Sequence, residues 1–181
     1  WEVLVTMTPA DYASFRDSLG QSSGFQSFQY RELEYLLGNK NAAFIEAHKN
    51  HPTNYQHLST VLNAPSLYDV CLQLLQKRGF DIPETHTHRD WQQPYEPSKQ
   101  VEAAWQKVYQ DTDTYWDLYE LAEKLVDLEY HFQQWRFNHM KTVERIIGHK
   151  HGTGGTSGVD YLQKALNLQF FPELWSVRTT L

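Results

Sequence analysis

Apolar side chains recur at helical spacing along most of the chain. Between residues 113 and 147 they form one continuous stripe, which predicts a long amphipathic helix. The stripe comprises Tyr115, Leu118, Ala122, Leu125, Val126, Phe132, Trp135, Val143 and Ile146. At about 1.5 Å per residue this helix would be about 50 Å long. No segment alternates apolar and polar residues over a convincing length, so the pattern predicts an all-α helical bundle.

Helix start and stop signals divide the rest of the chain. Thr8-Pro-Ala-Asp11 has the capping residue, the proline and the early carboxylate of a helix start, and Gly20 follows the expected end at Leu19. Further helices are predicted over 26–37, 41–49, 53–63, 66–78, 98–110 and 157–168. Residues 80–97 contain three prolines and are expected to form an irregular loop. We expect residues 1–181 to form a single helical domain.

The composition of the chain limits the classes of partner and ligand that we expect for it. The net charge of −6 argues against nucleic acid or an anionic membrane surface as a partner. No apolar run reaches the length of a membrane span. Cys71 is the single cysteine, which excludes an internal disulfide and favours a reducing, cytoplasmic location. Six Trp, 11 Tyr and 9 Phe would suit a core built around a planar ligand.

His139 lies on an aromatic face of the long helix. Residues three, four and seven positions apart share a helix face, so its neighbours are Phe132, Trp135, Arg136, Thr142, Val143 and Ile146. An imidazole in an aromatic wall, with a guanidinium one turn away, would suit an axial haem ligand beside a propionate partner. The alternative is a core histidine with no ligand role.

A glycine-rich segment, residues 148–158, follows the same helix. It lacks the Gly-Lys-Ser/Thr ending of a phosphate loop, and it follows a helix where dinucleotide motifs follow a strand. Nucleotide binding is therefore rejected. Its backbone amides could hold an anion such as a carboxylate at the start of the next helix, or the segment could be a hinge.

Two other groups of residues are candidate sites. His86, His88 and Asp90 contain the residue types of a two-histidine, one-carboxylate iron site, although they lie in a proline-flanked loop. Tyr12 and Arg16 lie four residues apart and project from one side of the first helix. An arginine there could bind a carboxylate in a bidentate manner, or the pair could be an ordinary surface contact.

Three long motifs together resemble the tryptophan 2,3-dioxygenase family. They are Ser22-Ser-Gly-Phe-Gln-Ser-Phe-Gln-Tyr-Arg31 followed by Glu34-Tyr-Leu-Leu-Gly-Asn-Lys40, then Trp135-Arg-Phe-Asn-His-Met140 leading to Gly152-Thr-Gly-Gly-Thr-Ser-Gly158, and finally Phe170-Phe-Pro-Glu-Leu174. They occur in the family's order and span nearly the whole chain, with the weakest match over 41–97.

The resemblance implies a haem enzyme. Members of the family are all-helical, bind haem b and typically form homotetramers. They use O₂ to open the indole ring of L-tryptophan at C2–C3, which gives N-formyl-L-kynurenine and begins the kynurenine pathway.

The resemblance also implies roles for individual residues. His139 matches the axial ligand of the haem iron, and Ser23, Trp135 and Arg136 match residues beside the haem. Five residues match the substrate side of the pocket: Tyr12 and Arg16 at the carboxylate, Thr153 at the amino-acid head group, and Trp1 and Leu19 at the pocket wall.

The family's distal histidine and several indole-contacting residues come from helices that precede the position of Trp1. We therefore expect this chain to lack the family's N-terminal portion, and the resemblance identifies no catalytic residue within it. A non-catalytic helical module that binds haem or tryptophan is the alternative.

Overall fold

The computed structural model describes residues 6, 8–16, 27–148 and 158–181. Backbone contacts divide the chain into two compact units: Trp1–Gly24 with Leu128–Gln169, here called unit 1, and Phe25–Asp127 with Phe170–Leu181, called unit 2. Over the described ranges every regular element is a helix and none is a strand, so the all-α prediction is confirmed. The assignment of one domain to residues 1–181 stays a prediction.

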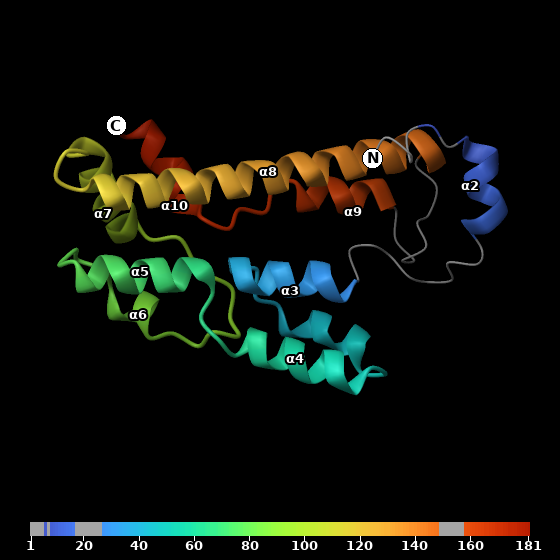
Figure 1. The fold of residues 1–181 in the computed structure, drawn as a ribbon, viewed down its shortest axis with the longest axis horizontal. Coiled ribbons are helices and arrows are strands. Elements are labelled where there is room, and N and C mark those ends of the chain that lie inside the picture. The colour runs from blue at the N-terminus through green and yellow to red at the C-terminus, as the bar shows by residue number, and fades with distance from the viewer. Residues whose placement is uncertain (1–5, 7, 17–26, 149–157) are drawn as a thin grey trace. The chain divides into compact units, whose positions relative to one another are not determined.

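The helices follow one another in the order drawn in Figure 1. Their bounds are α2 Pro9–Arg16, α3 Phe28–Leu37, η3 Ala42–His48, α4 Pro52–Leu62, α5 Leu67–Lys77, α6 Glu84–Thr87, α7 Lys99–Gln110, α8 Trp116–Ile147, α9 Gly158–Ala165, α10 Pro172–Ser176 and η4 Val177–Thr179. The predicted end of α2 at Leu19 lies outside the described residues. In the described part of the chain, no helix is both long enough and apolar enough to cross a membrane.

The structure differs from the sequence-based expectation in its shortest elements. Residues 42–48 form a 3₁₀ helix, and the expected irregular loop over 80–97 contains the one-turn helix α6. Neither α10 nor η4 was predicted. These elements have four, five and three residues, too few for an apolar period to repeat.

Within the described residues, three of the helix start and stop signals expected from the sequence are present, whereas Gly20 and Ser157 lie outside them. The Thr8 hydroxyl accepts a hydrogen bond from the Asp11 amide, N to Oγ1 3.1 Å, at the start of α2. Ser66 and Asp69 form a reciprocal capping box on α5. Gly38 ends α3 with φ 113°, where an added Cβ would lie 3.3 Å from the Ser66 hydroxyl oxygen, so glycine suits this position both in conformation and in space.

A core cluster of Tyr35, Ile45, Leu58 and Leu62 packs α3, η3 and α4 together in unit 2. Beside it, Arg31 and Glu34 form a buried ion pair, and the Arg31 guanidinium carbon lies 4.1 Å from the Phe44 ring centroid. Much of the Arg31–Lys40 segment therefore stabilises this part of the fold.

Lys40 is fully buried, and its ammonium group closes the C-terminal end of α4. Its Nζ atom donates to the carbonyl oxygens of Val61 at 2.7 Å, Leu62 at 3.3 Å and Ala64 at 2.9 Å. These carbonyls carry the partial negative charge of the helix end, which favours a cation there. Burial lowers the pKa of Lys40 to about 8, so the ammonium form still predominates at neutral pH.

Replacing Lys40 with methionine is expected to lower the free energy of unfolding by about 3 kcal/mol, because three carbonyls at the end of α4 lose their shared donor. Urea unfolding monitored by circular dichroism measures this change. Lys49→Met is the matched control, since Lys49 is exposed and forms an ion pair with exposed Glu46. Equal losses in the two variants would contradict the capping role.

A second core joins α5, α7 and α10 within unit 2. Trp105 and Tyr68 are buried at its centre, and the Trp105 Nε1 atom donates to the Tyr68 hydroxyl at 3.0 Å. The Tyr68 ring lies 5.4 Å from that of Phe171, which precedes α10. This packing brings the C-terminal residues onto helices that lie about 70 to 100 positions earlier in the sequence.

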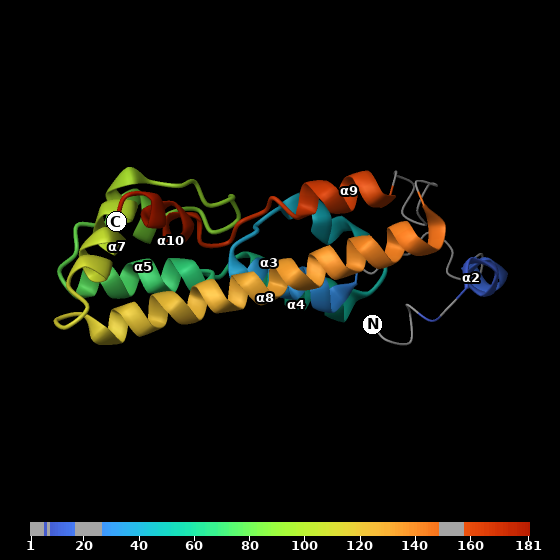
Figure 2. The ribbon, with the colours of Figure 1, turned by 90° about the horizontal axis from the view of Figure 1, so that it is seen from above.

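In unit 1, α9 runs alongside the C-terminal half of α8, as Figures 1 and 2 show. Val159, Leu162 and Ala165 form the buried stripe of α9, at the three-residue spacing of a helix face. Met140 is buried on α8. This arrangement places the residue after the glycine-rich segment beside the helix that carries His139.

Candidate functional site

His139 lies on the C-terminal half of α8, one turn after Trp135. The imidazole and the indole are stacked, with ring centroids 5.6 Å apart and an angle of 25° between the ring planes. The Phe132 ring continues the aromatic face, with its centroid 5.7 Å from that of Trp135. The aromatic part of the predicted face, from Phe132 through Trp135 to His139, is therefore present in the structure.

His139 is partly exposed and partly enclosed by this aromatic face. Desolvation lowers the pKa of its imidazole below the ordinary value, because the enclosure disfavours the charged form. At neutral pH the imidazole is therefore neutral, which is the form that coordinates iron.

Arg136 is buried beside the same face. Its Nη1 atom donates to the Leu168 carbonyl oxygen at 3.0 Å, and its guanidinium carbon lies 4.8 Å from the Phe132 ring centroid. Leu168 follows α9, so this side chain links two elements of unit 1. Its expected contact with haem stays a prediction, and the link to Leu168 was missed because a backbone acceptor has no sequence signal.

The structure describes only some of the residues that were predicted to bind the substrate or line the pocket. Tyr12 lies in α2 and is half-buried, whereas nothing is described of the Arg16 side chain on the same helix. Trp1, Leu19, Ser23 and Thr153 lie outside the described residues. The expected grouping of these residues around one substrate stays a prediction.

The iron-site hypothesis for His86, His88 and Asp90 is wrong. Within the described ranges, no group of three or more His, Cys, Asp or Glu residues could hold a metal ion. The Nε2 atom of His86 lies 3.1 Å from the Glu96 carbonyl oxygen, and Asp90 Oδ1 accepts a hydrogen bond from the Gln92 amide at 3.0 Å. His86 and Asp90 therefore each form a separate hydrogen bond within the local turn and do not converge on one point.

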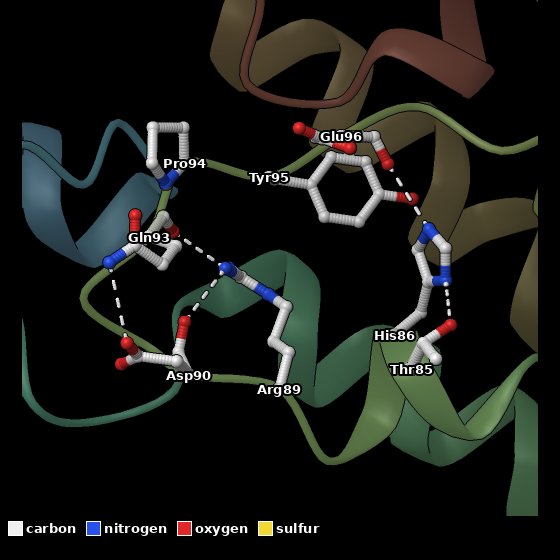
Figure 3. Close-up of a pocket in the computed structure, with 8 residues that line it drawn as sticks. All are labelled: Thr85, His86, Arg89, Asp90, Gln93, Pro94, Tyr95 and Glu96. Atoms are coloured by element: carbon white, nitrogen blue, oxygen red, sulfur yellow. Dashed lines mark hydrogen bonds between the residues drawn. The ribbon is translucent and has the colours of Figure 1, made fainter.

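His86 and Asp90 are among the residues that line a cavity of about 410 Å³ in unit 2, shown in Figure 3. Arg89 lies along its floor and donates to both carboxylate oxygens of Asp69, at 2.8 and 3.0 Å, and to the Gln93 carbonyl at 2.6 Å. The polar groups here hold the 85–96 turn on α5. The cavity belongs to unit 2, whereas the His139 face belongs to unit 1.

The described residues around His139 suit haem better than a protein-bound ion. Haem carries nitrogen donors of its own, so the protein would need to contribute one neutral nitrogen from a largely apolar wall. His139 supplies that nitrogen, and Trp135 and Phe132 supply flat apolar surface beside it. The residues present therefore fit the group.

The chain is also similar in sequence to proteins of one known family. A family model described as tryptophan 2,3-dioxygenase matches residues 1–64 and 106–181. Proteins named tryptophan 2,3-dioxygenase from Bacillus thuringiensis (strain Al Hakam) and Bacillus cereus (strain ATCC 10987 / NRS 248) are each 58% identical to the chain over all 181 residues. One from Burkholderia pseudomallei (strain 668) is 57% identical over the same span.

The chain spans 65% of the length of the two Bacillus relatives and 59% of the Burkholderia relative. The family model covers well over half of the chain, including the whole of α8 and the glycine-rich segment. The chain therefore belongs to the tryptophan 2,3-dioxygenase family.

Proposed function

We propose that the chain forms the greater part of a haem-dependent dioxygenase that converts L-tryptophan and O₂ to N-formyl-L-kynurenine. The observation that carries the proposal is the His139 imidazole, neutral and stacked on Trp135, in a chain 58% identical to proteins named for this activity. The same proposal includes a homotetramer, a cytoplasmic location and a role at the first step of the kynurenine pathway.

His139 would hold the haem iron from one side. When bound, haem b supplies the oxygen chemistry. Stacking on Trp135 limits rotation of the imidazole, so its coordinating nitrogen is directed before the cofactor arrives. Trp135, Ser23 and Arg136 are proposed to lie beside the haem.

The substrate would be held by its amino-acid end. Arg16 and Tyr12 are proposed to bind the carboxylate, and Thr153 in the glycine-rich segment to contact the head group. Trp1 and Leu19 are proposed to line the wall next to the indole. A bidentate contact with the carboxylate would orient the indole ring of the substrate. Less entropy would then be lost on reaching the transition state.

A second candidate is a module that binds haem or tryptophan without turnover. The observation that favours it is that the chain spans only 65% of the length of its Bacillus relatives. The residues that would complete the pocket in the family precede the position of Trp1.

Product formation separates the two functions. The haem-loaded, reduced chain is mixed with L-tryptophan and air, alone and together with the part of the Bacillus cereus relative that has no counterpart here. Near-ultraviolet absorbance from N-formylkynurenine is expected in the mixture. Arg16→Leu should raise the KM for tryptophan at least tenfold, because the carboxylate loses its cation.

Haem and tryptophan binding without product in either sample would favour the non-catalytic module. An unchanged KM in Arg16→Leu would remove Arg16 from the substrate site and leave the rest of the proposal standing. Arg145→Leu is the control, since Arg145 is an exposed arginine near the C-terminal end of α8.

A further inference from the structure

The cavity shown in Figure 3 is built from residues that the proposed haem and tryptophan site does not use. All of its lining residues fall between Thr85 and Glu96 in unit 2, within α6 and the turn that follows it. This segment lies between residues 64 and 106, which border the two ranges matched by the family model. A volume of about 410 Å³ has room for a small organic molecule. The family match therefore assigns no role to this cavity.

The guanidinium of Arg89 lies along the floor of the cavity, and all three of its nitrogen atoms contact the protein. Nε and Nη2 donate to the two carboxylate oxygens of Asp69, at 2.8 and 3.0 Å. Nη1 donates to the carbonyl oxygens of Asp90 at 3.4 Å and Gln93 at 2.6 Å. The charge of Asp69 also offsets that of the guanidinium. Arg89 therefore has little capacity left to bind an anionic ligand.

The other donors in the wall are used in the same way. His86 Nε2 lies 3.1 Å from the Glu96 carbonyl oxygen, which can only accept, so Nε2 carries the proton and donates it. The Thr85 hydroxyl oxygen lies 3.3 Å from His86 Nδ1. The Tyr95 hydroxyl donates to the buried Glu173 carboxylate at 2.6 Å. The wall therefore offers a ligand few hydrogen-bond donors.

The acceptors of the wall are less fully used. Oδ1 of Asp90 accepts a hydrogen bond from the Gln92 amide at 3.0 Å. Oδ2 lies 3.4 Å from the Gln93 Nε2 atom, beyond the usual range of about 2.7–3.2 Å for such a bond. Oδ2 can therefore accept a shorter hydrogen bond from a ligand. The exposed residue Glu96 adds a second carboxylate to the residues that line the cavity.

We propose that this cavity binds a small organic molecule through a primary ammonium group held by the Asp90 carboxylate. An ammonium supplies three donors and a positive charge, which match the acceptors and the carboxylates of the wall. Its carbon chain would lie against Tyr95 and Pro94, whose rings line the same cavity. A metal ion fits less well, because no group of three His, Cys, Asp or Glu side chains in the described residues could hold one.

Three probes with the same carbon chain test the charge preference: butylammonium, butyrate and 1-butanol. Each is titrated into the ¹⁵N-labelled full-length chain at low ionic strength, and the backbone amide shifts are followed by nuclear magnetic resonance. Butylammonium is expected to shift the amides of residues 85–96 with a dissociation constant of a few millimolar or below. Butyrate and 1-butanol are expected to leave these amides unshifted at the same concentrations.

A charge-only variant tests the role of Asp90. Asp90→Asn keeps Oδ1, and with it the hydrogen bond from the Gln92 amide, so Tm is expected to stay close to the wild-type value. The dissociation constant for butylammonium is expected to rise at least about fivefold, because the charge-assisted hydrogen bond is lost. Asp81→Asn is the matched control, since Asp81 is exposed just before α6 and is not one of the lining residues.

The opposite preference among the probes would overturn the proposal. Binding of butyrate in place of butylammonium would show an anion site, and equal binding of 1-butanol would show an apolar cavity without charge preference. An unchanged affinity in Asp90→Asn, or no shifts over residues 85–96 with butylammonium, would also contradict it. Because the tests involve neither haem nor tryptophan, their failure would leave the proposed function standing.

Discussion

Replacing His139 with alanine is expected to abolish the Soret band that one equivalent of haem gives to the wild-type chain. The imidazole is the iron ligand in the proposed site, and Trp135 and Phe132 offer contact surface but no strong donor for iron. Apolar contact alone would leave haem weakly and heterogeneously bound. This loss is measured by titrating the chain with haem and monitoring the absorbance from the near-ultraviolet to the visible.

Two variants sharpen this test. His131→Ala removes an exposed histidine two turns earlier on α8 and should leave the titration unchanged. His139→Gly leaves a space in which free imidazole can coordinate the iron, so added imidazole is expected to restore the Soret band. A wild-type band in His139→Ala would show that the ligand lies elsewhere.

Replacing Glu173 with alanine is expected to lower the free energy of unfolding by about 4 kcal/mol. Glu173 is buried, and its carboxylate accepts hydrogen bonds from the Tyr68 hydroxyl at 2.9 Å, the Tyr95 hydroxyl at 2.6 Å and the Ser98 amide at 2.7 Å. Burial, and then the Glu173 charge, raise the pKa of both tyrosines well above the ordinary value, so both remain donors. The truncation leaves all three donors without this acceptor.

Thermal unfolding measures the loss, which corresponds to a decrease of roughly 10 °C in Tm for a chain of this size. Glu173→Gln keeps one acceptor oxygen and the side-chain shape, so about half of the loss is expected. Glu96→Ala is the control because Glu96 is exposed in the same region. A Tm in Glu173→Ala within about 2 °C of the control would contradict the role of this carboxylate in holding α10 on unit 2.

The longer helices could be predicted from the sequence because their signals are local. Thr8, Ser66 and Gly38 identify helix ends through their own backbone and side-chain chemistry. The stripe on α8 repeats often enough to define a face. The helices α6 and α10 were missed because each has one turn or little more, and α10 is held in place by Tyr68 and Tyr95 from distant parts of the chain.

The candidate site was predictable to the extent that it lies on one helix. His139 and Trp135 are four residues apart, so helical geometry alone brings their rings together. The contact of Arg136 with Leu168 spans 32 positions and ends on a carbonyl oxygen that every residue possesses. The iron-site hypothesis failed for the related reason that short spacing in a loop does not bring side chains to one point, as His86 and Asp90 show.

We propose that this chain, with haem held by His139, supports insertion of both atoms of O₂ into L-tryptophan. Mass spectrometry of the product formed under ¹⁸O₂ tests this proposal, using the haem-loaded chain supplemented with the part of the Bacillus cereus relative that has no counterpart in it. N-formylkynurenine labelled at both inserted oxygen atoms is expected from the wild type, and no such product from His139→Ala. Product labelled at one position, or undiminished product from His139→Ala, would overturn the proposal.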